Sequence, residues 1–522
     1  MYKKINMCGI SIEIGKELFK KQNIFLDVHR GISENVIKVT DTQLAHQLLP
    51  TTTEDNNSTT QPVLIDKFTY LLFNGLIINT KKLSKKYNII DFKSDTDFVA
   101  QLIKNHTYEA LSDLRGSFAI SVVYITKSKI ISYRDHSGSR PLYYFIKNSS
   151  IKLHSDPRPL IKHFDIETGL LDEAFKIFGF VPEQILYSEN IVGLRCIRPG
   201  HITILSVIND KWTIESEKFV QLSEFKVKPI KLVSKIIKSF SLGIEKQPSA
   251  TFLSGGVDSS ILAINLKNKK ISSLTIASRK TNEIKRAENW SEILNIKNIS
   301  KKFSKSEVNH INLKKQKILP FNSKDGSNIL AISSLAQKHG FRIAFSGVGL
   351  DELTNGYNQI KKILIIHFLL LNSFTRLVAL FLGFKFVSEE LSNIQGSQYL
   401  KEHIISRLWS KKKPLTLKNL DMIKTILKEN EYEIKSWFSE NKVTNPSSQI
   451  LLADFIFYTR NQLLRESDII GYSMNIDIRA PFCEPNFFKT MINNKLKSKK
   501  IFIKFLKKNK WIEAPKEGFF FE

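Results

Sequence analysis

The stretch 250–264, ATFLSGGVDSSILAI, decides the fold of the second half of this chain. Its apolar start predicts a buried strand, and the apolar spacing from Val257 to Ile264 predicts a helix directly after two glycines. The first backbone N–H groups of such a helix have no intrahelical partners, so they bind anions. Gly255 and Gly256 allow a sharp turn and a close approach to phosphate oxygens. The alternative is an ordinary strand-to-helix turn with Ser and Asp caps.

The polar residues of this loop indicate how a nucleotide would be used. Ser254, Ser259 and Ser260 offer hydroxyl donors to phosphate oxygens. Asp258 would repel a phosphate unless Mg²⁺ lies between them, because that ion binds carboxylate and phosphate oxygens. The loop lacks the lysine of a Gly-Lys-Ser/Thr loop, which holds transferring terminal phosphates. It therefore favours an ATP that is cleaved between its α- and β-phosphates.

Strands and helices alternate after this loop. Apolar runs at Ile271–Ala277 and Ile343–Phe345 predict two more strands. This alternation predicts an α/β domain with a parallel sheet, helices on both faces and ligands at the carboxyl ends of the strands. A chain of 522 residues is too long for one core. We therefore predict two domains, with a boundary in the Lys- and Ser-rich region 206–235.

The chain carries a net charge of +28. Its lysines are spread along the sequence without an arginine-rich arm, so we interpret them as solvated surface and expect no nucleic-acid partner. A tRNA-modifying enzyme is the alternative that the charge would favour. In the densest basic run, 495–510, apolar residues recur at helical spacing and predict an amphipathic helix packed on a core.

The cysteines Cys8, Cys196 and Cys483 show no paired spacing, so we expect neither a disulfide framework nor a zinc site. Without a secretory signal, the expected location is the reducing cytoplasm. Residues 363–384 are long and apolar, but Arg376 interrupts them and would be costly in lipid. We expect buried or docked helices there, and contact with a membrane surface is left open but not favoured.

A candidate nucleophile lies near the start of the chain. Met7 and Cys8 precede alternating apolar residues through Ile14 that predict a strand. A lone cysteine beside a strand is usually a packed thiol. Removal of Met7 would instead leave Cys8 as the first residue, with a thiol and a free α-amine that can act as its base. We therefore predict that Met7 is the true start or that residues 1–6 are removed.

Five further segments occur in the order found in class II glutamine amidotransferases. They are HRGISEN (29–35), FNGLIIN (73–79), SDTDFVAQLI (94–103), LRGSFAISVVY (114–124) and RDHSGSRPLYYF (134–145). The loop SGGVDSS (254–260) resembles that of the ATP pyrophosphatases, and together these segments resemble the asparagine synthetase B family over essentially the whole chain. The resemblance implies an Ntn-hydrolase-type α+β sandwich (αββα) at 7–210, followed by an α/β parallel-sheet ATP-pyrophosphatase domain at 230–522.

The resemblance also implies roles for residues of the first domain. Cys8 would be the glutaminase nucleophile. Asn74 and Gly75 would form the oxyanion hole, with one side-chain amide and one backbone N–H directed at the tetrahedral oxygen. Asp95 would hold the α-amino group of glutamine.

Other residues receive roles in the second domain. Asp351, in the segment SGVGLDE (346–352), would join Asp258 as a Mg²⁺ ligand, and Lys516 would neutralise the departing pyrophosphate. The later segments LLRESD (463–468) and IDIRAPF (476–482) resemble parts that brace this site, and we expect structural ion pairs from their charges. The residues implied in ATP binding are Leu253, Ser254, Gly255, Gly256, Asp258, Ser259, Ser260, Ile276, Ser346 and Gly347.

Three positions depart from the family pattern. Gln47 stands where the family has an arginine that binds the glutamine carboxylate, and Leu76 replaces a glutamate after the Asn-Gly pair. Val348 replaces an acidic residue that acts on the acyl-adenylate, and valine can neither bind a cation nor move a proton. Glu352 could take over that role, or the acceptor differs from aspartate, or the site is impaired.

The expected function is that of an asparagine synthetase-like enzyme. It would use ATP and Mg²⁺ to amidate a carboxylate, by default aspartate to asparagine, through an acyl-AMP with release of AMP and pyrophosphate. The nitrogen would come from glutamine or ammonia. The alternatives are an amidotransferase for another carboxylate, such as a surface-sugar acid or a specialised metabolite, and a catalytically impaired member. The sequence is compatible with a homodimer.

Overall fold

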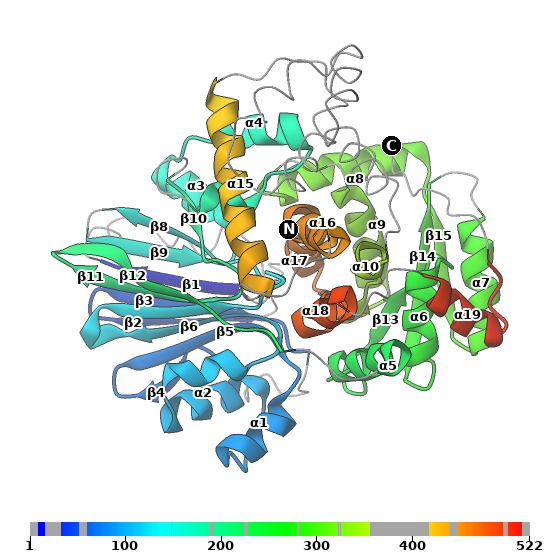
Figure 1. The fold of residues 1–522 in the computed structure, drawn as a ribbon, viewed down its shortest axis with the longest axis horizontal. Coiled ribbons are helices and arrows are strands. Elements are labelled where there is room, and N and C mark those ends of the chain that lie inside the picture. Colours follow the sequence, from blue (N-terminus) through cyan, green and yellow to red (C-terminus); the bar gives the residue numbers. More distant parts are fainter. Residues whose placement is uncertain are drawn as a thin grey trace.

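The first half of the chain folds into a sandwich of two antiparallel sheets, as the computed structural model shows (Figure 1). One sheet has the order β10-β8-β9-β1-β3-β2, and the other has the order β12-β11-β7-β6-β5-β4. The structure describes residues 9–15, 33–51, 60–147, 149–187, 193–223, 228–278, 282–321, 323, 325–354, 417–438, 446–493 and 499–513. The strands are β1 (Gly9–Ile14), β2 (Ser33–Val39), β3 (Thr42–Leu48), β4 (Val63–Asp66), β5 (Thr69–Ile77), β6 (Gly116–Tyr124), β7 (Lys129–Arg134), β8 (Tyr143–Lys147), β9 (Ser150–His154), β10 (Arg195–Cys196), β11 (His201–Ile208) and β12 (Lys211–Phe219).

Apolar side chains fill the space between the two sheets, and helices cover both outer faces. Ile12 on β1 and Leu72 on β5 belong to one buried cluster between the sheets. A second cluster joins Phe98 on α2 (Asp95–Asn105) to the outer face of the sheet that contains β5 and β6. On the other sheet, α3 (Pro157–Phe164) contacts β8 and β9. This layering confirms the predicted αββα sandwich. The remaining α-helices described in this half are α1 (Thr80–Tyr87) and α4 (Gly169–Phe178).

The second half contains a five-stranded parallel sheet of order β15-β14-β13-β16-β17, which confirms the predicted α/β domain. Two of its strands, β14 and β16, have the bounds predicted from the sequence. One face packs on α5, α6 and α7, and the other packs on α8, α9 and α17. The strands are β13 (Ser249–Phe252), β14 (Ile271–Ala277), β15 (Asn298–Lys302), β16 (Ile343–Phe345) and β17 (Asp477–Arg479). The helices are α5 (Pro229–Phe240), α6 (Val257–Leu266), α7 (Glu283–Leu294), α8 (Lys305–Ile318), α9 (Gly326–Lys338), α10 (Leu350–Leu353), α15 (Leu417–Phe438), α16 (Pro446–Asp454), a π-helix (Phe455–Leu464), α17 (Arg465–Ser473), α18 (Pro485–Asn493) and α19 (Lys500–Lys508).

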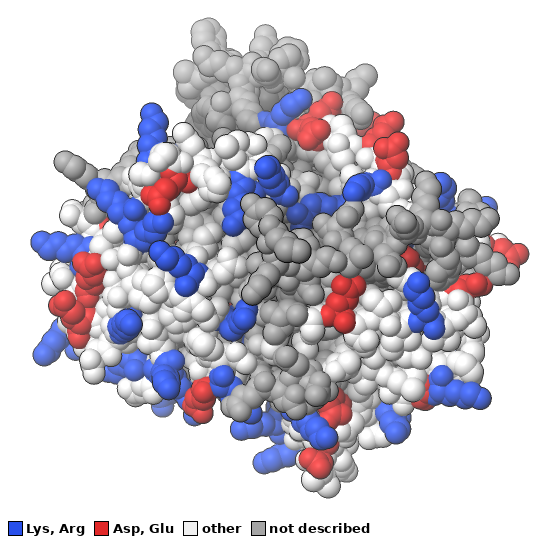
Figure 2. All heavy atoms as spheres, turned by 180° about the vertical axis from the view of Figure 1, so that it is seen from behind, with Lys and Arg blue, Asp and Glu red and all other residues white. Residues whose placement is uncertain are grey.

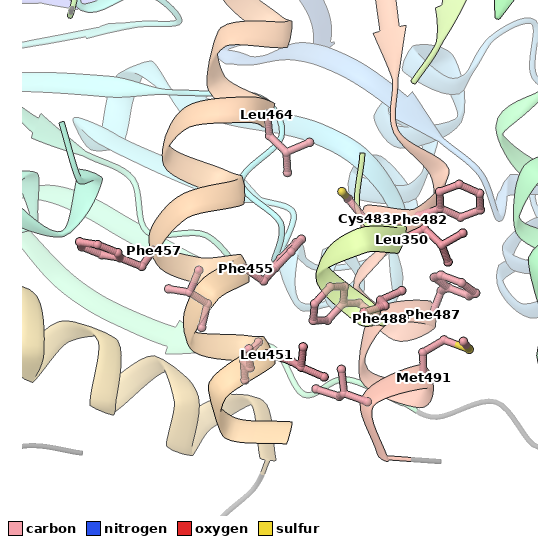
Figure 3. Packing of buried hydrophobic residues seen from close by; sticks show 14 of the residues in the cluster. Leu350, Leu451, Phe455, Phe457, Leu464, Phe482, Cys483, Phe487, Phe488 and Met491 are labelled. Carbon is pink, nitrogen blue, oxygen red and sulfur yellow. The ribbon is translucent and has the colours of Figure 1, made fainter. Parts of the chain in front are cut away.

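A large apolar cluster fixes the short helix α10, which begins at the second candidate site loop. Figure 3 shows Leu350 of α10 among Phe455, Phe482 and Phe488, which come from three other segments. The rings of Phe455 and Phe488 are 4.1 Å apart between centroids. Burial of such side chains contributes about 1.5–3 kcal/mol each, so the loop that precedes α10 is held by the core of the domain.

Buried ion pairs join the two halves of the chain. Arg140 of the sandwich contacts Asp468 at 3.2 Å and Asp477 at 2.5 Å, and Arg115 contacts Glu484 at 2.7 Å. The two contacts of Arg140 confirm the structural ion pairs expected from the segments 463–468 and 476–482. Removing one partner of a buried pair typically costs about 3–5 kcal/mol, so the two halves hold a fixed relative position.

Figure 2 shows lysine and arginine side chains dispersed over one face of the molecule, with aspartates and glutamates among them. Within the described ranges, no helix combines the length and the apolar character that crossing a membrane requires. The apolar segment 363–384 lies outside the described residues. The amphipathic helix predicted in the run 495–510 is present as α19, with Phe502 and Leu506 fully buried.

Candidate active site

The loop between β13 and α6 has the geometry that its glycines predict. Gly255 has a φ of +74°, and a Cβ added there would lie 2.8 Å from Cβ of Arg286. Gly256 follows as the N-cap of α6, so the first N–H groups of the helix face the loop. Thr275 Oγ1 donates to the Leu253 carbonyl at 2.7 Å, and this places the buried Ile276 beside the loop.

The serines of the loop differ in their exposure. Ser254 is exposed, and its hydroxyl accepts a hydrogen bond from Gly256 N at 3.3 Å. The Ser259 hydroxyl accepts from Ser254 N at 3.2 Å and so preforms the turn. Ser260 is fully buried in α6. Ser254 and the backbone of the loop are therefore the groups that a phosphate can reach.

The second loop, between β16 and α10, lies directly against the first. A Cβ added to Gly347 would lie 3.1 Å from both Asp258 Cβ and Ser259 N, so the two loops touch at this glycine. Ser346 N donates to the carbonyl of Arg479 at 2.9 Å, which ties the loop to β17. Because β13 and β16 are parallel neighbours, both loops lie at the carboxyl edge of the sheet, as predicted.

Two carboxylates from these loops converge on one cation. The Lys499 ammonium is 2.9 Å from Asp258 Oδ1 and also contacts Asp351 Oδ1. Burial opposes the charge on Lys499, but the two aspartates outweigh it and raise its pKa. The described residues contain no cluster of three or more metal-ligating side chains. This donor set fits Mg²⁺, which is commonly held by one or two carboxylates and completed by substrate phosphates.

The carboxyl group of Glu352 is hydrogen bonded to the backbone of its own loop. It is fully buried, and its Oε2 accepts a hydrogen bond from Gly349 N at 2.8 Å. Burial is the largest cause that raises the pKa of Glu352 to about 8, and the charge of Asp351 adds to it. This raised pKa favours the neutral form of Glu352 near pH 7, and its Oε2 faces the loop backbone. Val348, the apolar replacement, packs against the main core cluster.

The candidate oxyanion hole lies on β5. Gly75 has a φ of +136°, and a Cβ there would lie 2.0 Å from the carbonyl oxygen of Ser117. The side chain of Asn74 is 1% exposed, yet neither its oxygen nor its nitrogen has a hydrogen-bond partner among the described residues. Unpaired buried amides are rare in folded proteins, and each requires a reason such as a missing ligand.

Two side chains hold the backbone next to Asn74. The Gln61 side chain accepts a hydrogen bond from Phe73 N at 2.6 Å and donates one to Phe73 O at 3.0 Å. A ring nitrogen of His46 lies 3.1 Å from the same carbonyl, and burial lowers the pKa of His46 to about 4. The neutral imidazole of His46 therefore helps to hold the backbone at Phe73. This role of His46 was not predictable from the sequence.

Asp95 stands at the start of α2, beside the end of β5. Its carboxylate accepts hydrogen bonds from Ile77 N at 3.3 Å and from Thr96 N at 3.1 Å. Burial raises its pKa to about 6 against the opposing effect of these bonds. Gln47 on β3 pairs with Gly9, the first residue of β1. Leu76 is buried in the core.

The structure brings some predicted site residues together and leaves others unplaced. The ATP loop, Asp258, Asp351 and Gly347 form one site, and Asn74, Gly75 and Asp95 lie at neighbouring ends of β5 and α2. Cys8 and Lys516 lie outside the described residues. Sequence reasoning missed Lys499, because it belongs to a run of lysines that no local pattern separates. It also missed Trp511, whose Nε1 donates to Gly255 O at 3.2 Å.

A cavity lies where the two halves of the chain meet. Ser117 and Ser139 of the sandwich line it together with Ala480 and Cys483 of the second half. Ser117 is the residue that Gly75 approaches, and Cys483 Sγ donates to Val348 O at 3.4 Å. The cavity therefore borders a neighbour of each candidate site.

Comparisons with known proteins agree with this arrangement. The asparagine synthase family profile matches residues 243–519, and that of the glutamine amidotransferase domain matches residues 7–218. Asparagine synthetase [glutamine-hydrolyzing] 1 of Bacillus subtilis is 25% identical over 531 residues, which cover 94% of this chain and 80% of that protein. Putative asparagine synthetase [glutamine-hydrolyzing] 2 of Methanocaldococcus jannaschii is 24% identical over 293 residues, covering 49% of this chain and 56% of that protein. The chain therefore belongs to the asparagine synthase family of ATP-dependent ligases, with a glutamine amidotransferase domain ahead of the synthase domain.

Proposed function

We propose that this protein amidates a carboxylate at the expense of ATP, with aspartate as the first acceptor to test. The observation that carries the proposal is the convergence of Asp258 and Asp351, from two loops, on one cation beside a phosphate-binding turn. Such a pair suits the pyrophosphate of an ATP that is cleaved at its α-phosphate. The synthase domain of the family implies use of ATP.

The synthase chemistry requires two displacements at this edge of the sheet. The acceptor carboxylate attacks the α-phosphorus, the bond to the β-phosphate breaks, and pyrophosphate leaves with its electron pair. Ammonia then attacks the acyl carbon of the acyl-AMP, a proton is lost from nitrogen, and AMP leaves. Ser254 and the loop N–H groups would bind phosphate oxygens, and Mg²⁺ held by Asp258 and Asp351 would neutralise their charge. We expect Lys516 to act on the departing pyrophosphate.

The first domain would supply the ammonia. We propose Cys8 as the nucleophile on the glutamine carboxamide, with Asn74 Nδ2 and Gly75 N as donors to the tetrahedral oxygen. The Asn74 amide has no hydrogen-bond partner among the described residues, and this supports the role because a ligand oxygen would satisfy it. Ammonia released there would pass through the cavity lined by Ser117 and Cys483 to the acyl-AMP.

The acceptor has a second candidate, a carboxylate other than aspartate. Val348 supports it, because the apolar side chain replaces the acid at this position and packs on the core. Glu352 does not compensate, since its carboxyl group accepts the hydrogen bond from Gly349 N. A less charged or larger acid would then fit a site that has lost a charged group. We propose a surface-sugar acid or a specialised metabolite as this class.

The direct test is pyrophosphate release with a panel of carboxylates, run with glutamine and separately with ammonium. We expect one acid of the panel, aspartate first, to release pyrophosphate and AMP in equal amounts with either nitrogen source. Release with ammonium but not with glutamine would support the synthase site and contradict the glutaminase. Failure with every acid would favour a catalytically impaired member of the family.

The acidic limb of the glutaminase pH profile should report Asp95. If its carboxylate binds the α-ammonium of glutamine, protonation near pH 6 removes that attraction, because its pKa is raised to about 6. The α-amine of Cys8 would titrate near pH 8 and give a first decline in kcat/KM. We expect the logarithm of kcat/KM for glutamine to fall more steeply below about pH 6. Steady-state kinetics between pH 5 and about 8 measure it.

Matched variants distinguish the titration of Asp95 from a general loss of activity at acidic pH. Asp95→Asn should lower kcat/KM for glutamine and lose the steeper part of the profile. Asp91→Asn, which changes an exposed carboxylate on the preceding loop, should keep the wild-type profile. An unchanged steep limb in Asp95→Asn would contradict the assignment of the α-amino group to Asp95.

A further inference from the structure

The ammonium group of Lys499 lies between two carboxylates that come from different loops. Its Nζ is 2.9 Å from Asp258 Oδ1 and also contacts Asp351 Oδ1. The side chains of Lys499, Asp258 and Asp351 are 20%, 17% and 12% exposed, so solvent and ligands reach this position. A cation of the protein itself therefore occupies the point where the proposed metal ligands meet.

Contacts within α19 and just after it fix the position of Lys499. Lys499 is the N-cap of that helix, and Phe502 and Leu506 are fully buried in the core. Beyond the helix, Trp511 Nε1 donates to Gly255 O at 3.2 Å. The helix α19 and the residue Trp511 beyond it are thus anchored, the latter directly to the 254–260 loop. The four-carbon stem of the lysine can still change rotamer, so its head group can move while its backbone stays in place.

Because of its positive charge, Lys499 competes with free metal ions for the two carboxylates. Asp258 and Asp351 would repel each other without a cation between them, and Lys499 offsets part of their negative charge. A Mg²⁺ ion needs the same carboxylate oxygens, so it must displace the ammonium. A nucleotide changes the balance, because its phosphates supply further ligands to the ion and a new anionic partner for the lysine.

We propose that Lys499 is a positioning residue that keeps Asp258 and Asp351 converged before the nucleotide binds and makes metal binding depend on the nucleotide. The inference rests on the proposed function, in which these two aspartates hold the metal. When the nucleotide and metal bind together, the ammonium leaves the carboxylates and pairs with phosphate oxygens. Lys499 thus acts on metal and nucleotide binding, before pyrophosphate departs and Lys516 acts. It acts through Asp258, Asp351 and the phosphates and does not contact the reacting atoms.

Binding of Mn²⁺, followed by electron paramagnetic resonance, tests the proposal without an activity assay. We expect Lys499→Met to bind MnCl₂ alone roughly tenfold more tightly than wild type, a difference of about 1.4 kcal/mol. With saturating α,β-methylene-ATP, that advantage of the variant should be lost. In thermal unfolding, Lys499→Met should have the lower midpoint without divalent ions, and MgCl₂ should raise its midpoint more than that of wild type.

Two further variants keep the test decisive. Lys499→Arg retains the positive charge and should resist free Mn²⁺ as wild type does. Lys504→Met removes an exposed lysine of the same helix and should also behave as wild type. Equal affinities of wild type and Lys499→Met for MnCl₂ alone would overturn this inference. Absence of Mn²⁺ binding in both proteins, even with α,β-methylene-ATP, would overturn the metal site of the proposed function as well.

Discussion

Replacing Asp351 with Asn is expected to lower ammonium-dependent pyrophosphate release by about 10³-fold, or about 4 kcal/mol in the barrier. The amide has the same shape but no charge, so with Asp258 it would hold Mg²⁺ less tightly, and less of the phosphate charge would be neutralised. Ammonium as the nitrogen source makes the assay independent of the first domain. The effect is measured from initial rates of pyrophosphate formation, using the acceptor that the carboxylate panel identifies.

The neighbouring carboxyl group provides the matched control. Glu352→Gln keeps an oxygen that can accept from Gly349 N, and it resembles the neutral form that the raised pKa of about 8 favours at pH 7. We therefore expect a change of less than about tenfold in the same assay. If Glu352→Gln were as impaired as Asp351→Asn, Glu352 would be the acid that replaces the missing one at Val348. The contrast between adjacent carboxylates thus decides how the site works without that acid.

The contrast also shows what the sequence can and cannot predict here. The 254–260 loop was predictable because its determinants are local: a buried strand, two glycines and a helix whose first turn carries Asp258. Glu352 was a reasonable candidate acid from its position alone. Only the backbone conformation at Gly349, with a φ of +108°, reveals that the carboxyl group turns back to the loop.

Long-range contacts account for what the sequence left out. Lys499 follows the second loop by more than a hundred residues and resembles every other lysine of its run. Its role depends on the path of α19 and on the anchors Phe502 and Trp511. Asn74 shows the complementary case, because a motif supplies the residue. Whether its amide finds a partner depends on how β5 packs within the sandwich, and no side chain or backbone group of the described ranges pairs with it.

That unpaired amide leads to the second large effect. Asn74→Ala should lower glutamine-dependent amide formation and glutamine hydrolysis by about 10²–10³-fold, because one donor to the tetrahedral oxygen is lost. Ammonium-dependent synthesis should keep its wild-type rate, since the synthase loops are unaltered. Glutamate release and amide formation, measured with each nitrogen source, give the two ratios.

The change in the free energy of unfolding distinguishes an amide that acts in catalysis from one that stabilises the fold. A buried amide without partners contributes no hydrogen bond to stability, so its removal should change the free energy of unfolding by no more than about 1 kcal/mol. Ser121→Ala, on the neighbouring strand, removes a hydroxyl that is hydrogen bonded to Ser132 at 2.9 Å. That control should lose stability yet keep full glutaminase activity. A stable, active Asn74→Ala would contradict the oxyanion role. If Asn74→Ala has a lower free energy of unfolding than Ser121→Ala, the amide stabilises the fold. An amide that only binds a ligand would not contribute to the stability of the unliganded protein.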